Sequence, residues 1–136
     1  MAADNPTAAS PTADNPTADN PTAHMLGKEL YVIFTRPVGP PEEIRRLLPK
    51  HLERQVALEK AGIMFGAGPM FEKGADRPAF GMIVVRANSF EEADAIAAED
   101  PFHKAGLREY EIHKWKLNEG SYTVTVNYSD QTVTIA

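Results

Sequence analysis

The chain runs Leu30-Tyr31-Val32-Ile33-Phe34-Thr35 and then, after Arg36-Pro37, continues with Pro40-Pro41-Glu42-Glu43. A run of β-branched and aromatic residues of this length favours a buried strand, which Arg36-Pro37 ends. Proline and glutamate are favoured in the first turn of a helix, where the free N–H groups and the positive end of the dipole lie. The stretch therefore predicts a strand followed by a helix, which we expect to end near Lys60, before Gly62.

Three further strands are predicted downstream. Each is a short apolar run bounded by turn residues, which is typical of strands in a small sheet. Glycines interrupt the first run, so a bulge or a close backbone approach is expected around Gly66 to Pro69. The three predicted strands are Ile63–Phe71, Ala79–Ala87 and Tyr110–Leu117.

A second helix is predicted to begin at Ser89, because Ser89-Phe90-Glu91-Glu92 has the serine and the third-residue glutamate of a capping box. We expect it to end near Asp100-Pro101, since proline cannot continue a helix. The resulting order, βαββαβ, places two helices on one face of an antiparallel sheet. It predicts a ferredoxin-like α+β domain.

Both ends of the chain differ from this pattern. Two β-branched runs flank Ser129-Asp130-Gln131 and predict a β-hairpin, so we assign residues 25–120 to the domain and residues 121–136 to a hairpin extension. Residues 1–24 repeat Ala-Asp-Asn-Pro-Thr without apolar periodicity and run into His24-Met25, which resembles a cloning junction. We interpret residues 1–24 as a disordered expression tag and linker, with Met25 as the native start.

Composition excludes several classes of function. Residues 1–24 contain three of the 19 acidic residues and none of the 14 basic ones, so the remainder has a net charge of −2. Such a balance argues against a nucleic-acid or acidic-membrane binder. No apolar run approaches the roughly 18 residues of a membrane span, and no signal peptide follows Met25. With no cysteine, the chain fits a cytoplasmic protein.

A histidine lies on the apolar side of the first predicted helix. At 100° per residue His51 falls among Ile44, Leu47, Leu48, Leu52 and Leu58. A polar ring there needs a partner, and Asp100 is the best candidate. At the end of the second helix an aspartate would meet the negative end of the dipole, which favours pairing with a cation or a donor.

The His51–Asp100 pair supports two interpretations. A carboxylate that accepts from one ring nitrogen fixes the tautomer and leaves the other nitrogen free to take a proton from a ligand. His51 would then be a general base that Asp100 orients. The alternative is a buried pair that satisfies itself structurally, since structural ion pairs also perturb pKa values.

Other residues are candidates for substrate binding. Backbone N–H groups near Gly68 and Pro69 could stabilise developing negative charge, although a bulge that only shapes the sheet is an equal alternative. Arg36 and Arg54 could neutralise an anionic substrate. A pocket between sheet and helices would be lined for a flat ring by Phe34, Phe65 and Phe102, together with Met64 and Trp115, although such residues are more often core.

A metal site is not expected. His103 and His113 do not match any compact ligand spacing with His51, and no cluster of carboxylates accompanies them. We interpret both as surface or pocket-rim residues, and we expect the protein to need no metal and no cofactor.

The strands are apolar enough that the sheet face without helices should not be left in water. We therefore expect a homodimer or a higher homo-oligomer, in which sheet-to-sheet packing forms a dimeric α+β barrel. The partners that we expect are a small-molecule substrate and further copies of this chain.

Several short motifs, in this order and spacing, resemble the YCII-related (YciI-like) domain family over roughly Leu30 to Leu117. The motifs are His51-Leu52, Gly62, Gly66-Ala67-Gly68-Pro69, Ser89-Phe90-Glu91-Glu92-Ala93, Asp100-Pro101-Phe102, Ala105-Gly106-Leu107 and the strand Tyr110 to Trp115. The resemblance implies a ferredoxin-like dimeric α+β barrel with an active site at His51 and Asp100. The hairpin after Gly120 departs from the family pattern.

Characterised relatives in this family include a chlorohydroxyhydroquinone dehydrochlorinase, and muconolactone isomerase-type enzymes share the barrel. The resemblance thus implies a cofactor-independent lyase of the dehydrochlorinase type, or an isomerase, acting on a small hydroxylated ring compound that can carry chlorine. Two alternatives stay open from the residues. One is a non-catalytic domain that binds a small ligand, and the other is an oligomerisation scaffold without a ligand.

Overall fold

The computed structural model describes residues 20–136. Of the expected tag, residues 1–19 lie outside the described residues. The chain divides into two compact units, one of which is Glu29–Lys116 and the other of which includes Leu117–Ala136. Each unit is described by itself.

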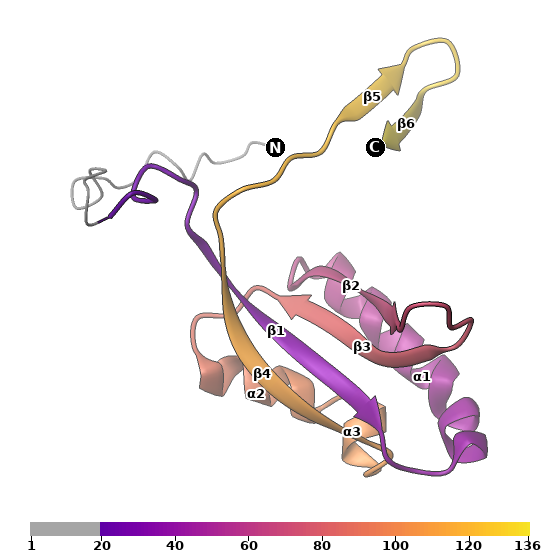
Figure 1. The fold of residues 1–136 in the computed structure, drawn as a ribbon. Helices are drawn as coiled ribbons and strands as arrows, with labels where there is room; N and C mark the ends of the chain where they lie inside the picture. The colour runs from indigo at the N-terminus through magenta and orange to yellow at the C-terminus, as the bar shows by residue number, and fades with distance from the viewer. Residues whose placement is uncertain (1–19) are drawn as a thin grey trace. The chain divides into compact units, whose positions relative to one another are not determined.

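The larger unit confirms the βαββαβ order, with one additional turn of helix before the last strand (Figure 1). Its four strands form one sheet in the order β2-β3-β1-β4, and β3 is antiparallel to both β1 and β2. The elements are β1 (Lys28–Pro37), α1 (Pro41–Lys60), β2 (Met64–Phe71), β3 (Pro78–Val85), α2 (Phe90–Ala98), α3 (Pro101–Lys104) and β4 (Arg108–Leu117).

The helices cover one face of the sheet and bury the core there (Figure 1). Alternate residues of a strand point to the same face, so Tyr31 and Ile33 of β1 lie beside Ile83 and Val85 of β3. Small residues of α2, Ala93 and Ala97, pack against them and let the helix approach the sheet closely. All six side chains are almost fully buried, and this core fixes which face of each strand points toward the helices.

The helix ends follow local chemistry. Pro40 and Pro41 open α1 with Glu42 in the first turn, and Gly62 adopts a left-handed φ of +79° just after the helix, as expected. Ser89 accepts the backbone N–H of Glu92 at 3.0 Å and begins α2. These interactions join residues within one helical turn of each other, so the sequence alone predicts them.

One detail of the prediction was wrong, and a second feature lies slightly outside the predicted segment. Leu48 and Leu52 do not lie with His51 but are 40% and 50% exposed, because the buried face of α1 is centred on Leu47, His51 and Leu58. In β2 the register irregularities fall between Met64 and Gly66 and at Met70/Phe71, whereas Gly66 to Met70 pair regularly with β3. The expected bulge therefore flanks the glycine segment and does not coincide with it.

The smaller unit contains the predicted hairpin, β5 (Val124–Asn127) paired antiparallel with β6 (Thr132–Ile135). Its register places Val124 opposite Ile135 and Val126 opposite Val133, so one face of the hairpin is apolar and the other carries threonines. In the described part of the chain, no helix is both long enough and apolar enough to span a membrane.

Candidate functional site

One face of α1 carries the polar residues that meet the end of α2 and the turn after it. His51 and Arg54 lie one helical turn apart on this face. Arg54 donates from Nη2 to the backbone oxygen of Ile96 at 2.8 Å, and His51 contacts Asp100. The helical spacing therefore brings His51 to Asp100 from a position 49 residues away in the chain.

The His51–Asp100 contact defines the tautomer of the ring. Nδ1 of His51 lies 2.9 Å from Oδ2 and 3.1 Å from Oδ1 of Asp100, so Nδ1 carries the hydrogen that it donates to the carboxylate. The side chains are 15% and 5% exposed. Within residues 20–136, Nε2 of His51 has no hydrogen-bond partner, yet it is not among the fully buried polar atoms. Nε2 is therefore the ring nitrogen that solvent or a ligand can reach.

The position of Asp100 differs from the prediction. Helix α2 ends at Ala98, and Asp100 is instead the N-cap of α3, where its carboxylate accepts the backbone N–H of Phe102 at 2.8 Å. Asp100 thus faces the positive end of a helix, not a negative one. Burial acts to raise the pKa of Asp100, but the hydrogen bond and charge of His51 and the Phe102 N–H lower it below the ordinary value of 3.8.

The ring of Phe102 packs against the imidazole of the His51–Asp100 pair. Its side chain is 2% exposed, and its ring stacks on the imidazole of His51 with centroids 4.5 Å apart and an interplanar angle of 27°. The guanidinium carbon of Arg108 lies 5.3 Å from the centroid of the same ring. Stacking against a buried ring restricts the orientation of the imidazole, so Nε2 is held in one direction.

His103 belongs to the same cluster. Its Nδ1 lies 2.7 Å from the backbone oxygen of Ala97 and must donate to it, so in the neutral ring Nε2 accepts the hydroxyl hydrogen of Thr35 at 2.8 Å. Burial lowers the pKa of His103 below its ordinary value of 6.5, although the Ala97 bond and the charge of Asp100 act in the opposite direction. His103 is thus a neutral ring with a hydrogen bond at each nitrogen. It is not the surface or pocket-rim residue that we predicted.

Two signals in the sequence pointed to His103. Thr35 lies on the same strand face as Tyr31 and Ile33, so its hydroxyl is buried in the core and needs a hydrogen-bond partner. His103 follows Asp100 by three residues, which is the spacing of one helical turn. Neither signal names the other residue, because nothing local connects β1 to α3.

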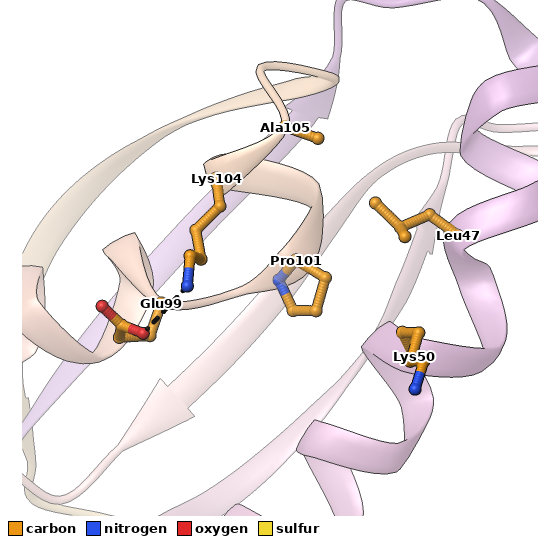
Figure 2. Close-up of a pocket in the computed structure, with 6 residues that line it drawn as sticks. All are labelled: Leu47, Lys50, Glu99, Pro101, Lys104 and Ala105. Atoms are coloured by element: carbon orange, nitrogen blue, oxygen red, sulfur yellow. Dashed lines mark hydrogen bonds and ion pairs between the residues drawn. The ribbon is translucent and has the colours of Figure 1, made fainter.

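A groove of about 410 Å³ lies between α1 and α3 (Figure 2). It is lined by Leu47, Lys50, Glu99, Pro101, Lys104 and Ala105. Lys50 and Pro101 are the chain neighbours of His51 and Asp100, whose own side chains are not part of the lining. The groove combines apolar side chains with two lysines, of which Lys104 lies 3.4 Å from Glu99.

A sequence model of the YCII-related domain matches residues 28–116, which include the helices and all of the four-stranded sheet except the last residue of β4. The chain belongs to the YCII-related domain family. No curated protein matches the chain.

Among solved structures, this YCII-related chain is similar to 5-chloro-2-hydroxyhydroquinone dehydrochlorinase (TftG) from Burkholderia phenoliruptrix in complex with 2,5-dihydroxybenzoquinone. The two share 22% sequence identity and superpose with a TM-score of 0.50, covering 64% of this chain and 93% of the other. The likeness shows a common fold.

Three residues predicted to bind substrate in this YCII-related domain lie on the opposite face of the sheet from the pair. The ring of Phe34 lies 6.0 Å from Phe80 and 5.7 Å from His113, and Arg36 lies over Phe80 at 4.5 Å. Phe34 is opposite Met82 in the ladder and alternates with Ile33 and Thr35, which face the helices. Phe65 contacts Trp115, at 6.1 Å between centroids.

The remaining predicted residues are placed as follows. Phe102 and Arg54 lie near the pair, whereas Gly68 and Pro69 lie in β2 opposite Met82 and Gly81. Gly68 lies on the same face of the sheet as Phe34, because Met82 is paired with both residues. No group of three or more potential metal ligands occurs among the described residues.

Proposed function

We propose that this YCII-related protein is a cofactor-independent lyase of the dehydrochlorinase type, or an isomerase, acting on a small hydroxylated aromatic or quinone compound, including chlorinated ones. The observation that carries the proposal is the geometry of His51. Its Nδ1 is held by a buried carboxylate and its ring by Phe102, while Nε2 has solvent contact. This arrangement suits a group that takes and returns a proton.

Loss of HCl from a chlorinated trihydroxybenzene needs two proton movements and no oxidant. In the first, a hydroxyl proton moves to the ring carbon that bears chlorine, which forms a C–H bond and a ketone. In the second, a base takes another hydroxyl proton, a second carbonyl forms, and the C–Cl electron pair leaves with chloride. The ring loses H and Cl and becomes a hydroxyquinone.

His51 would carry both proton movements in this proposal. Nε2 takes the hydroxyl proton, and the resulting imidazolium is stabilised by the carboxylate of Asp100 and can return the proton to carbon. Asp100 itself stays ionised, since its pKa lies below the ordinary value. The fixed ring direction places base and substrate in one orientation, which lowers the entropy cost of reaction.

The groove between α1 and α3 supports the proposal as a route for the substrate. Its lining includes Lys50 and Pro101, the chain neighbours of His51 and Asp100, and its apolar side chains suit the faces of a small ring. The positive charge of Lys50 favours the approach of an ionised hydroxyl compound. The similar fold of a protein named for dehydrochlorination of 5-chloro-2-hydroxyhydroquinone supports the choice of substrate class.

The experiment is to incubate the protein with 5-chloro-2-hydroxyhydroquinone without oxidant or metal and to measure chloride release against quinone formation. We expect one chloride for each hydroxyquinone. Binding of the compound without chloride release or isomerisation would favour the alternative, a non-catalytic ligand-binding domain. The homo-oligomeric state and the cytoplasmic location stay predictions.

A further inference from the structure

Arg108 begins β4 on the face of the sheet that the helices cover. Tyr110, two residues further along the strand, packs against the core of that face. Nη1 of Arg108 donates to the backbone oxygen of Thr35 at 3.0 Å, and its guanidinium lies over Phe102. Phe102 stacks on His51, so one aromatic ring connects Arg108 to the proposed base.

Most of the donors of Arg108 have no acceptor. A guanidinium carries five N–H groups. Among residues 20–136, the backbone oxygen of Thr35 is the acceptor that Arg108 has, and its Nε is fully buried without a partner. Its terminal nitrogens are not among the fully buried atoms without a partner, and none of the ion pairs of the described residues includes Arg108. A buried donor of a charged group that lacks an acceptor is unfavourable. The terminal N–H groups of Arg108 are therefore the ones that an acceptor of a ligand can reach.

The other arginines of the cluster and its surroundings differ from Arg108. Arg54 also has a buried Nε without a described partner, but it donates to the backbone oxygen of Ile96 near the C-terminal end of α2. The free backbone carbonyls at that end of a helix stabilise a positive charge. Arg86 donates to two backbone oxygens, those of Gly62 and Met64, and lies over Phe65. Of the three, only Arg108 contacts the ring on which His51 stacks.

The charges around Arg108 favour an anion. The carboxylate of Asp100 is already paired with His51 and with the Phe102 N–H, and His103 is held as the neutral ring. The charge of Asp100 also acts on the guanidinium, but the two groups form no ion pair among those of the described residues, so the N–H groups of Arg108 are not used by this carboxylate. A negatively charged oxygen would satisfy both the charge and the free donors.

We propose that Arg108 is the anion-binding residue of the site and that it takes an ionised hydroxyl oxygen of a planar ring. The inference rests on the proposed function for the substrate class, but its test needs no turnover. Arg108 then selects compounds that are ionised before the proton transfer begins.

The test follows the side-chain Nε–H signal of Arg108 by ¹H–¹⁵N NMR, because an anion bound at the terminal nitrogens changes the shielding of the whole guanidinium. The probe is 2,5-dihydroxybenzoquinone, and benzoate and inorganic phosphate are the second and third probes. We expect a saturable shift with the first probe. If none of the three anions shifts the signal, the inference is overturned, whatever turnover shows. A shift without chloride release from 5-chloro-2-hydroxyhydroquinone supports the inference and overturns the proposed function alone.

Variants separate anion binding from a structural role. Dissociation constants for 2,5-dihydroxybenzoquinone should rise by about tenfold or more in Arg108→Gln, and Arg108→Lys should recover part of the loss. Arg86→Gln is the matched control, since Arg86 also joins backbone carbonyls to an aromatic ring. Arg108→Gln protein that folds and binds like the wild type overturns the inference, as does a loss confined to Arg54→Gln.

Discussion

Nδ1 of His51 lies 2.9 Å from Oδ2 of Asp100, a carboxylate that also caps α3. The two roles of Asp100 can be separated, because asparagine caps a helix about as well as aspartate but carries no charge. We expect Asp100→Asn to lower the free energy of unfolding by about 1 kcal/mol and Asp100→Ala by about 2 to 3 kcal/mol. Urea denaturation at neutral pH measures both.

The matched control is Ser89→Ala, which removes the cap of α2 without touching a charged pair. It should cost about 1 kcal/mol, the ordinary value of a lost cap. Equal losses in the two Asp100 variants would mean that the cap of α3 contributes nothing measurable.

His103 should make stability depend on pH. Its pKa is lowered in the folded state, so the unfolded chain binds a proton first as the pH falls. The contribution of His103 is therefore fully present above its ordinary value of 6.5 and is lost as the pH falls through that value toward the folded pKa. Unfolding free energies from about pH 8 to about pH 5 should fall more steeply in the wild type than in His103→Gln. Parallel pH profiles of the wild type and His103→Gln would contradict a neutral His103 ring that is hydrogen-bonded at both nitrogens.

Gly81 has no side chain, and this leaves room for the side chain of Thr35 in the position where it contacts His103. A Cβ at Gly81 would lie 3.1 Å from Cγ2 of Thr35, which is buried and opposite it in the ladder. Gly81→Ala should lower the free energy of unfolding by about 1 kcal/mol and shift the ring signals of His103. Gly68→Ala is the control, because a Cβ at Gly68 meets nothing within 4 Å and the change should stay within about 0.5 kcal/mol. Unchanged His103 signals in Gly81→Ala would show that Thr35 adjusts freely.

Assembly can be tested on the sheet face without helices. Phe65 and Trp115, which are 41% and 38% exposed, contact each other there. If a second copy packs on this face, light scattering after size exclusion should give at least twice the mass of one chain, and Trp115→Glu should reduce it to that of one chain. A wild-type protein with the mass of one chain would refute the predicted oligomer.

The order of elements was predictable because its signals are local. The start of α1 is encoded by Pro41 and Glu42 in its first turn, and the start of α2 by the side chain of Ser89. The approach of His51 to Asp100 was also predictable in part, because helical periodicity places His51 on the buried side. The proline after Asp100 was interpreted as an end, although Pro101 also begins the helix α3.

The composition of the site was less predictable. Both faces of β1 are apolar, since Leu30 and Val32 are as buried as Tyr31 and Ile33, so the sequence does not say which face meets the helices. That ambiguity placed Phe34 near the pair, whereas Thr35 is the residue on the helix side. Arg108 was missed for a related reason, because its neighbour Phe102 reaches it only through the packing of α3 on the sheet.

The central claim is that Nε2 of His51 moves the proton while Asp100 holds the ring. The most direct measurement is the rate of chloride release from 5-chloro-2-hydroxyhydroquinone by the wild type and by His51→Asn, with thermal unfolding recorded for both proteins. The account predicts a rate in the folded His51→Asn variant that is lower by about a hundredfold or more. A folded variant that releases chloride within a few-fold of the wild-type rate would contradict it.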